Sequence, residues 1–312
     1  MTLIVREFQP GDAGAAADIL RAAMPYFVMT PETVAWQVAS GPAAQHYRLL
    51  IAEADGELLG ISRTGIMFDT SVPGQAFANI SVHPARRGRG AGTALLAAAE
   101  EYVTGLGASA IYAWTADDEQ SLAFAARHGY RRGRSAHFQR LDLVQGLPPV
   151  PPLPEGVELR TAADFIGDPA PIYAADAESA LDEPSDVAVD AITYEDWLTY
   201  FWHRPDLDRD LTSVAVVDGV VASVTLAQTD GGSRYWTGMT GTRRAYRGRG
   251  LAKLVKTHSL HRARAVGYTE AFTNNDAGNV AMLAVNRWLG YRPSATEWRY
   301  IRELPGPSTF AG

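Results

Sequence analysis

A duplicated arginine-glycine segment constrains the fold of this chain more than any other feature. Residues 87–92 read Arg-Gly-Arg-Gly-Ala-Gly, and residues 247–252 read Arg-Gly-Arg-Gly-Leu-Ala, 160 positions later. A helical pattern, a short strand and a second helix follow each copy, and the second helix ends in Gly-Tyr at 129–130 and at 290–291. From the loop glycine to the terminal glycine the distance is 129 − 90 = 39 residues in the first copy and 290 − 250 = 40 in the second. The spacing predicts two related folding units.

The chain length agrees with two units. A sequence of 312 residues with 46% apolar content can bury a core in each of two domains. Residues 147–156 read Leu-Pro-Pro-Val-Pro-Pro-Leu-Pro-Glu-Gly, which favours extended polyproline II and interrupts helices and central strands. We therefore expect an N-terminal domain over 1–146, a linker over 147–156 and a C-terminal domain over 157–312.

The local patterns predict the same elements in both halves. Asp-Gly turns at 55–56 and 218–219 separate apolar runs, which is a strong β-hairpin signal. Each loop is followed by a helix, a short strand and another helix, and a further helix precedes each hairpin. These predicted elements span 93–104, 110–114, 253–265 and 270–273, with the early helices near 15–24 and 193–202. The fold class is therefore mixed α/β, with helices flanking a mostly antiparallel sheet in each half.

Composition excludes several kinds of chemistry. The absence of cysteine rules out disulfides, thiolate zinc sites and a thioester on the enzyme. Four histidines show no metal-ligand spacing with one another, so no metal is expected. The net charge of -7 opposes nucleic-acid binding, although Arg-Gly clusters are present. With no long apolar run and no secretion signal, a cytoplasmic protein without a membrane partner is expected. The four histidines are His83, His128, His203 and His258.

The two arginine-glycine loops are candidate anion sites. A glycine turn between a strand and a helix leaves unpaired backbone N–H groups at the positive end of the helix dipole. Neighbouring arginines add charge-assisted contacts to phosphate. A dinucleotide fingerprint does not fit, because Thr93 and Lys253 stand where its third glycine is needed, and neither loop carries the Gly-Lys-Ser/Thr of a P-loop.

The remaining pattern, Arg-x-x-Gly-x-Gly/Ala between a strand and a helix, resembles the GNAT acetyltransferase superfamily, once in each half. The resemblance implies that the protein binds acetyl-CoA or another acyl-CoA, with the pantetheine arm of the coenzyme between two splayed parallel strands. The strand before the loop is 78–82 in the first half and 237–242 in the second. A backbone N–H there would stabilise the oxyanion formed when an amine attacks the thioester. The coenzyme residues implied in the first half are Val82, Arg87, Gly88, Arg89, Gly90, Ala91 and Gly92. Those in the second half are Thr240, Thr242, Arg247, Gly248, Arg249, Gly250, Leu251, Ala252, Asn275 and Asn279.

The second helix of each unit distinguishes the halves. Many superfamily members carry an early asparagine that contacts the coenzyme and a late tyrosine that protonates the leaving thiolate. These positions fall on Asp118 and Ala125 in the first half and on Asn279 and Asn286 in the second. The resemblance therefore favours a C-terminal active site with Asn286 as its catalytic residue. Asparagines that only cap the helix or lie on the surface are the alternative, and the first half either binds acyl-CoA or serves as a scaffold.

The expected activity is acetyl transfer to a small-molecule primary amine by direct attack on the thioester. Three acidic residues, Glu178, Asp182 and Glu183, lie where the superfamily shapes its acceptor pocket, so they are candidates to bind a cationic amine, or they form a solvated face. A mycothiol-synthase-like acyltransferase and a non-catalytic acyl-CoA sensor are the alternatives. The expected assembly is a monomer or a homodimer.

Overall fold

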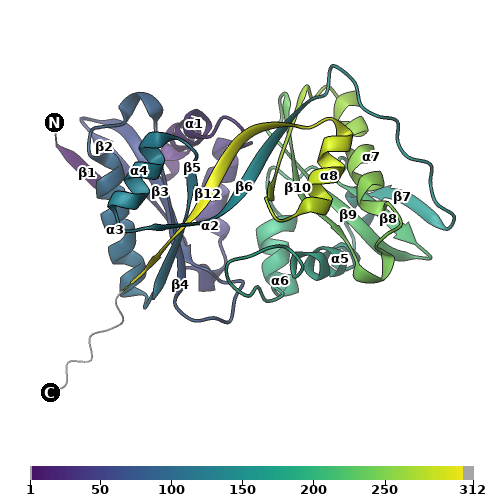
Figure 1. Ribbon diagram of the computed structural model, residues 1–312, viewed down its shortest axis with the longest axis horizontal. Helices are drawn as coiled ribbons and strands as arrows, with labels where there is room; N and C mark the ends of the chain where they lie inside the picture. Colours follow the sequence, from purple (N-terminus) through teal and green to yellow (C-terminus); the bar gives the residue numbers. More distant parts are fainter. Residues whose placement is uncertain (1, 305–312) are drawn as a thin grey trace.

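The computed structural model describes residues 2–304, and its helices and strands alternate along the chain as the repeat predicts (Figure 1). The first half contains β1 Leu3–Glu7, α1 Ala13–Ala23, α2 Pro31–Ser40, β2 Arg48–Ala54, β3 Glu57–Ile66, β4 Gln75–Val82, α3 Ala91–Gly105, β5 Ala110–Ala116, α4 Glu119–Arg127 and β6 Arg131–Asp142. The second half contains β7 Val157–Thr161, α5 Ala170–Ala180, α6 Tyr194–Trp197, β8 Ser213–Val217, β9 Val220–Thr229, β10 Arg234–Thr242, α7 Leu251–Ala265, β11 Glu270–Asp276, α8 Val280–Leu289 and β12 Arg292–Glu303.

All the named strands form one sheet of 12 strands whose order is symmetric about its centre. The order is β1-β2-β3-β4-β5-β12-β6-β11-β10-β9-β8-β7. The closing strands of the two halves are exchanged: β12 pairs with β5, β6 pairs with β11, and β12 and β6 pair with each other in the middle. In Figure 1, β12 and β6 run side by side across the centre of the molecule. Each half is therefore completed by a strand from the other.

The predicted boundaries at 146 and 157 do not divide this sheet. Segment 147–156 connects β6 to β7, as a linker should, but both closing strands cross to the opposite half. The division into domains 1–146 and 157–312 stays a prediction about the chain.

Each half is a three-layer unit with helices on both faces of its sheet. In the first half α3 packs on one face through Leu95, Ala99 and Val103, while α1 and α2 cover the other. In the second half α7 covers one face, and α5 and α6 cover the other. The core beneath α1 also contains Trp236 and Phe272, so apolar burial joins the two halves as well.

The parallel strand pair splays apart in both halves. β4 and β5 pair only from Gln75 to Phe77, and β10 and β11 pair only from Arg234 to Trp236. Beyond these points each pair diverges toward the helix that follows the glycine loop. This geometry, with two tandem units and flanking helices, confirms the predicted mixed α/β class. None of the helices in the described part of the chain is long and apolar enough to cross a membrane.

Candidate functional site

The first arginine-glycine loop has the backbone of an anion cradle. Gly88 and Gly90 have φ angles of 79° and 83°, in the left-handed region where residues with a side chain are strained. The first hydrogen bond of α3 runs from Ala94 N to Gly90 O at 3.0 Å, so the N–H groups of residues 91–93 precede it and face out of the helix end. A Cβ built at Gly88 would meet no atom within 4 Å, so the space in front of the loop is open.

The arginines of this loop differ in their partners. Glu57 binds Arg86 at 2.7 Å and Arg89 at 3.2 Å. Arg87 lies 3.6 Å from Asp118, which also caps α4, and it lines the adjoining cleft. Arg86 also lines the cleft, but Glu57 holds its guanidinium at 2.7 Å, whereas the carboxylate beside Arg87 is 3.6 Å away, so Arg87 is the less tightly paired of the two.

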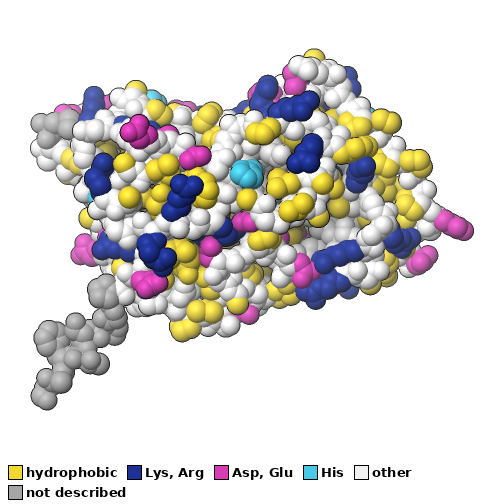
Figure 2. Space-filling view, viewed as in Figure 1, with side chains coloured by type: hydrophobic (Ala, Val, Ile, Leu, Met, Phe, Trp, Pro, Cys, Tyr) yellow, Lys and Arg dark blue, Asp and Glu magenta, His cyan; other side chains and the backbone are white. Residues whose placement is uncertain are grey.

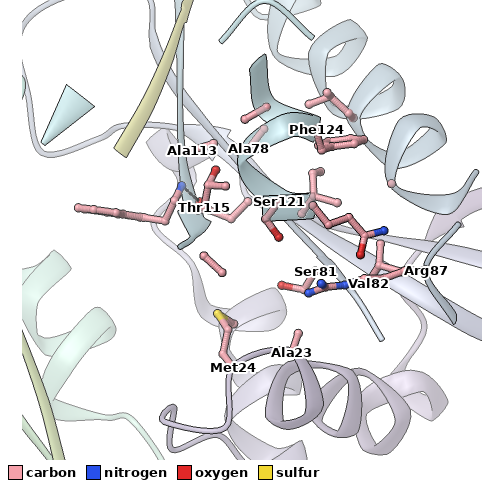
Figure 3. A pocket seen from close by; sticks show the side chains of 18 of the residues that line it. Ala23, Met24, Ala78, Ser81, Val82, Arg87, Ala113, Thr115, Ser121 and Phe124 are labelled. Carbon is pink, nitrogen blue, oxygen red and sulfur yellow. Dashed lines mark hydrogen bonds between the residues drawn. The ribbon is translucent and has the colours of Figure 1, made fainter. Parts of the chain in front are cut away.

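A cleft of about 470 Å³ extends from this loop between the diverging strands β4 and β5. Figure 3 shows Ala23 and Met24 at the end of α1 on one side, with Thr115 of β5 and Ser121 of α4 facing them across the opening. Several residues predicted to contact the coenzyme line it. They are Val82, Arg87, Gly88, Gly90, Ala91 and Gly92; Arg89 lies outside the lining. A volume of this size is in the range of small-molecule sites.

Side chains from the second half of the chain help to complete the inner end of the cleft. Asn274 of β11 and Glu297 of β12 line it, together with Phe138 of β6. Glu297 is only 6% exposed, and its Oε1 accepts a hydrogen bond from the Tyr26 hydroxyl at 2.8 Å. Burial raises the pKa of Glu297, and the bond from Tyr26 and the charge of Arg63 oppose that rise.

The second arginine-glycine loop has the same backbone but different partners. Gly248 and Gly250 have φ angles of 77° and 75°, and Leu254 N donates to Gly250 O at 3.0 Å. Its arginines, however, are bound to acidic residues of α5 and the turn after it. Arg243 pairs with Glu178 at 2.9 Å, Arg244 pairs with Asp182 at 2.7 Å, and Arg247 also pairs with Asp182. Figure 2 shows basic and acidic side chains side by side in the region of α5.

These ion pairs place two predicted amine-binding residues at the loop. Hydrogen bonds from Arg244 and Arg247 hold the pKa of Asp182 well below its usual range, so this carboxylate stays charged next to the anion cradle. Glu178 also accepts from the backbone N–H of Arg244 at 2.7 Å. Glu183, the third predicted residue, is exposed and forms no ion pair in the described part of the chain. The structure thus brings Glu178 and Asp182 to the loop arginines.

Helix α5 closes directly onto β10. A Cβ added to Gly241 would lie 2.4 Å from Cβ of Ser179, a distance that real atoms do not tolerate. The matching residue in the first half, 160 positions earlier, is Ser81, which lines the open cleft.

Thr240 and Thr242 turn their hydroxyls to β9, where they contact Thr225 and Ser223 at 3.0 and 2.9 Å. The register of β10 against β9 shifts between residues 237 and 240, a β-bulge that the matching strand β4 lacks.

A buried polar network links α7 and α8 to β6 and β11. Lys256 of α7 is 1% exposed and donates to Oδ1 of Asn286, which is fully buried. The Asn286 amide donates in turn to Gln139 and Asn275, each at 2.7 Å. The hydroxyls of Tyr291 and Thr237 lie 3.2 Å apart in the same interior. Asn286 is therefore held by protein groups on every side in this conformation.

The remaining predicted residues of the second half have structural contacts. Asn279 caps α8, since its Oδ1 accepts from Met282 N at 3.2 Å. Leu251 is 1% exposed and packs in the core beneath α7. Arg249 and Ala252 lie in the loop and at the start of that helix. A coenzyme role for these residues, and a catalytic role for Asn286, stay predictions; the open cleft lies in the other half.

Two residues that line the cleft, Arg63 and Glu297, were not singled out from the sequence, and neither was Tyr26, which donates a hydrogen bond to Glu297. Glu297 could not be placed by comparing loops, because it follows the second Gly-Tyr pair yet serves the first half through the exchanged strand. One signal for Glu297 was available in the sequence. The closing strand of the second half has a carboxylate at this position, whereas the closing strand of the first half has Ala136 there.

The fold, the paired glycine loops and the splayed strands define an acyltransferase of the GNAT class. The model of the Acetyltransferase (GNAT) family matches residues 16–130 and 174–291, which together make up most of the chain. The chain belongs to this family and carries two tandem copies of its domain.

Curated relatives and solved structures agree with this assignment. A mycothiol acetyltransferase of Nocardia farcinica is 29% identical over 301 residues, covering 92% of this chain and 93% of the relative. One from a Nocardioides species is 28% identical and covers 68% of this chain and 75% of the relative. A GCN5-related N-acetyltransferase from Sphaerobacter thermophilus has 25% identity and a TM-score of 0.72, covering 98% and 97% of the two chains. A tandem GNAT protein from the clavulanic acid biosynthesis pathway matches with a TM-score of 0.74 and 22% identity, over 98% of this chain and all of that one.

Proposed function

We propose that this acetyltransferase binds acetyl-CoA in the N-terminal cleft and transfers the acetyl group there to a small-molecule primary amine. The observation that carries the proposal is the open 470 Å³ cleft between β4 and β5, which adjoins the Gly88 to Gly92 loop. This location differs from the C-terminal active site expected from the asparagine pattern. The reason is spatial: the matching volume of the second half is filled by Ser179, Lys256 and Asn286.

The residues at the outer end of the cleft fit the diphosphate of the coenzyme. The N–H groups of residues 91–93 face out of the start of α3, and the guanidinium of Arg87 lies beside them. The positive φ of Gly88 and Gly90, with no neighbour within 4 Å of a Cβ at Gly88, permits close backbone approach by a phosphate. These groups would hold the anion without any rearrangement of the loop.

The groups at the inner end fit acyl transfer. Acetyl-CoA supplies an activated acetyl thioester, which an unprotonated amine can attack directly. The edge of β4 that diverges from β5 presents backbone groups toward the cleft around Ile80 and Ser81, where an N–H could stabilise a developing oxyanion. Glu297 and Tyr26 are placed to handle the proton that the amine must lose.

A mycothiol-directed reaction is the second candidate, because the relatives that match most of the chain are named mycothiol acetyltransferases. The acceptor would then be an amino-sugar conjugate in the same cleft. A competition assay separates the candidates: simple amines and the amino-sugar conjugate are offered together, and the acetylated product is identified by mass spectrometry.

Matched variants of the two loop arginines test the location. Arg87→Ala removes the guanidinium that faces the open cleft, so acetyl-CoA affinity should fall about 10- to 100-fold, the usual worth of a charge-assisted contact. Arg247→Ala, the equivalent change in the second loop, should leave affinity within about twofold. Isothermal titration calorimetry gives both the affinity and the number of sites.

Activity is read from release of CoA with a thiol-reactive dye, which meets no background from a chain that lacks cysteine. A panel of primary amines supplies the acceptor. Loss of acetyl-CoA binding in Arg247→Ala, with Arg87→Ala unaffected, would place the coenzyme in the second half and refute the proposal. Binding without CoA release for every amine would instead support a sensor.

A further inference from the structure

The inner end of the N-terminal cleft contains a carboxylate and a guanidinium that do not pair with each other. Glu297 and Arg63 both line the cleft, yet no ion pair joins them within the part of the chain that the structure describes. Arg63 is close enough for its charge to lower the pKa of Glu297. A cavity lined by two opposite charges that do not pair with each other suits a ligand that has both a positive and a negative group.

Arg63 has an unmet hydrogen-bonding requirement. Its Nε is buried and has no hydrogen-bond partner among residues 2–304. The Arg63 side chain lines the cleft and forms no ion pair in the described part of the chain, so its guanidinium is not committed to a protein carboxylate. Arg63 lies opposite Asn79 in the pairing of β3 and β4, where strand β4 begins to diverge from β5.

Glu297 is held in place by the strand exchange. On β12 it lies between Ala116 of β5 and Ala136 of β6, two small neighbours. The Tyr26 hydroxyl holds its Oε1 at 2.8 Å, so the carboxylate has a fixed orientation at the cavity wall.

Aromatic side chains surround this end of the cleft. Phe27 and Phe138 line it, their ring centroids 6.1 Å apart, and the Tyr26 ring packs 4.3 Å from that of Phe138. Ring faces attract ammonium groups and also accept apolar side chains. The cavity thus offers an apolar wall next to one negative and one positive group.

We propose that Glu297 and Arg63 form the acceptor subsite of this acetyltransferase, and that its substrate class is the α-amino acids: Glu297 receives the ammonium group and its proton, and Arg63 binds the carboxylate. The inference rests on the proposed function, since it assumes that acetyl-CoA enters the same cleft. It assigns the proton acceptor to a strand that belongs, along the chain, to the other half of the molecule.

The reaction balances as follows. The Glu297 carboxylate takes one proton from the ammonium and leaves a neutral amine with a free electron pair. That pair forms the C–N bond to the acetyl carbon while the C–S bond breaks and its electron pair leaves on sulfur. The nitrogen then loses a second proton, which neutralises the thiolate. The products are an N-acetyl amino acid and the CoA thiol, and Glu297 returns its proton to water.

Paired substrates test the roles of the two side chains. L-phenylalanine is compared with 2-phenylethylamine, and L-leucine with 3-methylbutylamine, because each pair differs by one carboxylate. Wild-type protein should prefer the amino acid by at least ~10-fold in kcat/KM. Arg63→Met should abolish that preference by lowering kcat/KM for the amino acids alone. Glu297→Gln should lower kcat about 100-fold for either member of a pair, within the usual range for loss of a general base.

Folding controls accompany these variants. Gln keeps the volume of Glu and can still accept from Tyr26, and unchanged acetyl-CoA affinity verifies an intact cleft. Glu297→Asp, which retains a carboxylate, should recover part of the lost kcat, whereas a purely structural role would give Asp no advantage over Gln.

The outcomes separate this inference from the proposed function. If acetyl-CoA does not bind, or binds through Arg247, the proposed function fails. If acetyl-CoA binds through Arg87 but amino acids are not acetylated, the amino-acid assignment is overturned while the cleft remains the donor site. A Glu297→Gln variant with wild-type kcat would likewise overturn the role of Glu297.

Discussion

The two halves of this protein share a backbone plan but differ in whether the space between their splayed strands is open. Leu96 and Ala125 border the open cleft of the first half, and their counterparts in the second half are Lys256 and Asn286, which are buried and hydrogen-bonded to each other. The glycine loops have nearly the same φ angles in both. The comparison teaches that a preserved loop does not by itself preserve a site, because a few buried side chains determine whether a ligand can follow the loop inward.

The end of the first helix shows the same contrast. Ala23 and Met24, at the end of α1, line the open cleft of the first half. In the second half, Asp182 after α5 binds two loop arginines, and Ser179 fits against Gly241. The second loop thus has an internal carboxylate bound to its arginines, including Arg247, the counterpart of Arg87.

The largest expected effect concerns Lys256, one of only two lysines in the chain. Burial lowers the pKa of Lys256 to about 7, against about 10.4 in an unfolded chain. Between these values the unfolded state binds more protons, so stability should rise with pH from about 7 to 10. The difference corresponds to on the order of 4 kcal/mol.

Leucine stands at the matching position of the first half, Leu96. Replacing Lys256 by leucine should remove the rise of stability with pH. The readout is the difference between wild type and Lys256→Leu in urea unfolding at pH 7, 8.5 and 10. The variant also leaves Oδ1 of Asn286 without its donor, at a cost of about 1 to 3 kcal/mol, so it should be the less stable protein at pH 10. Lys253→Leu, on the same helix, is the control and should keep the rise. If the unfolding free energies of wild type and Lys256→Leu changed with pH in the same way, Lys256 would not be neutral in the folded protein.

The second expected effect concerns the loop glycines. Valine at position 90 or 250 would be forced to positive φ, which costs about 1 to 2 kcal/mol of stability in either half. Gly90→Val should also lower acetyl-CoA affinity about 100-fold, because the N–H cradle moves, whereas Gly250→Val should leave affinity within about twofold. Equal losses of acetyl-CoA affinity in calorimetry would mean that both halves bind the coenzyme, which would contradict the difference between an open and a closed half.

The smallest expected effect concerns Asp182. Its ion pairs are exposed, so Asp182→Asn should change the thermal midpoint by less than about 2 °C. The number of acetyl-CoA molecules bound should stay at one, because Ser179 and the Lys256 network still close the second half. A second bound equivalent would show that the ion pairs of Asp182 with Arg244 and Arg247 alone keep that half closed.

Local structure could be predicted well from the sequence. The Asp-Gly turns form with φ of 52° and 79° at Asp55 and Gly56, and of 50° and 78° at Asp218 and Gly219, as tight hairpins require. The helix predicted over 93–104 spans Ala91–Gly105, and the one predicted over 253–265 spans Leu251–Ala265. These elements depend on neighbours in the chain, so their signals are local.

The exchange of closing strands could not be predicted in this way. β6 and β12 carry similar strand patterns, and the pattern of a strand does not say which distant partner it joins. Lys256 was equally hidden, since a lysine on an amphipathic helix normally belongs to its solvated face. The open and closed interiors depend on contacts between residues far apart in sequence, such as Gln139 with Asn286.

Because β6 and β12 cross between the halves, the ten-residue connection at 147–156 is not needed to hold the halves together. A protease cut within that connection would release no fragment, since each piece contributes a strand to the sheet of the other. The same arrangement is what a two-fold dimer with swapped C-terminal strands would become if its two genes were fused end to end. In such an arrangement each half can differ in its interior, and the closing strand of the second half still supplies Glu297 to the cleft of the first.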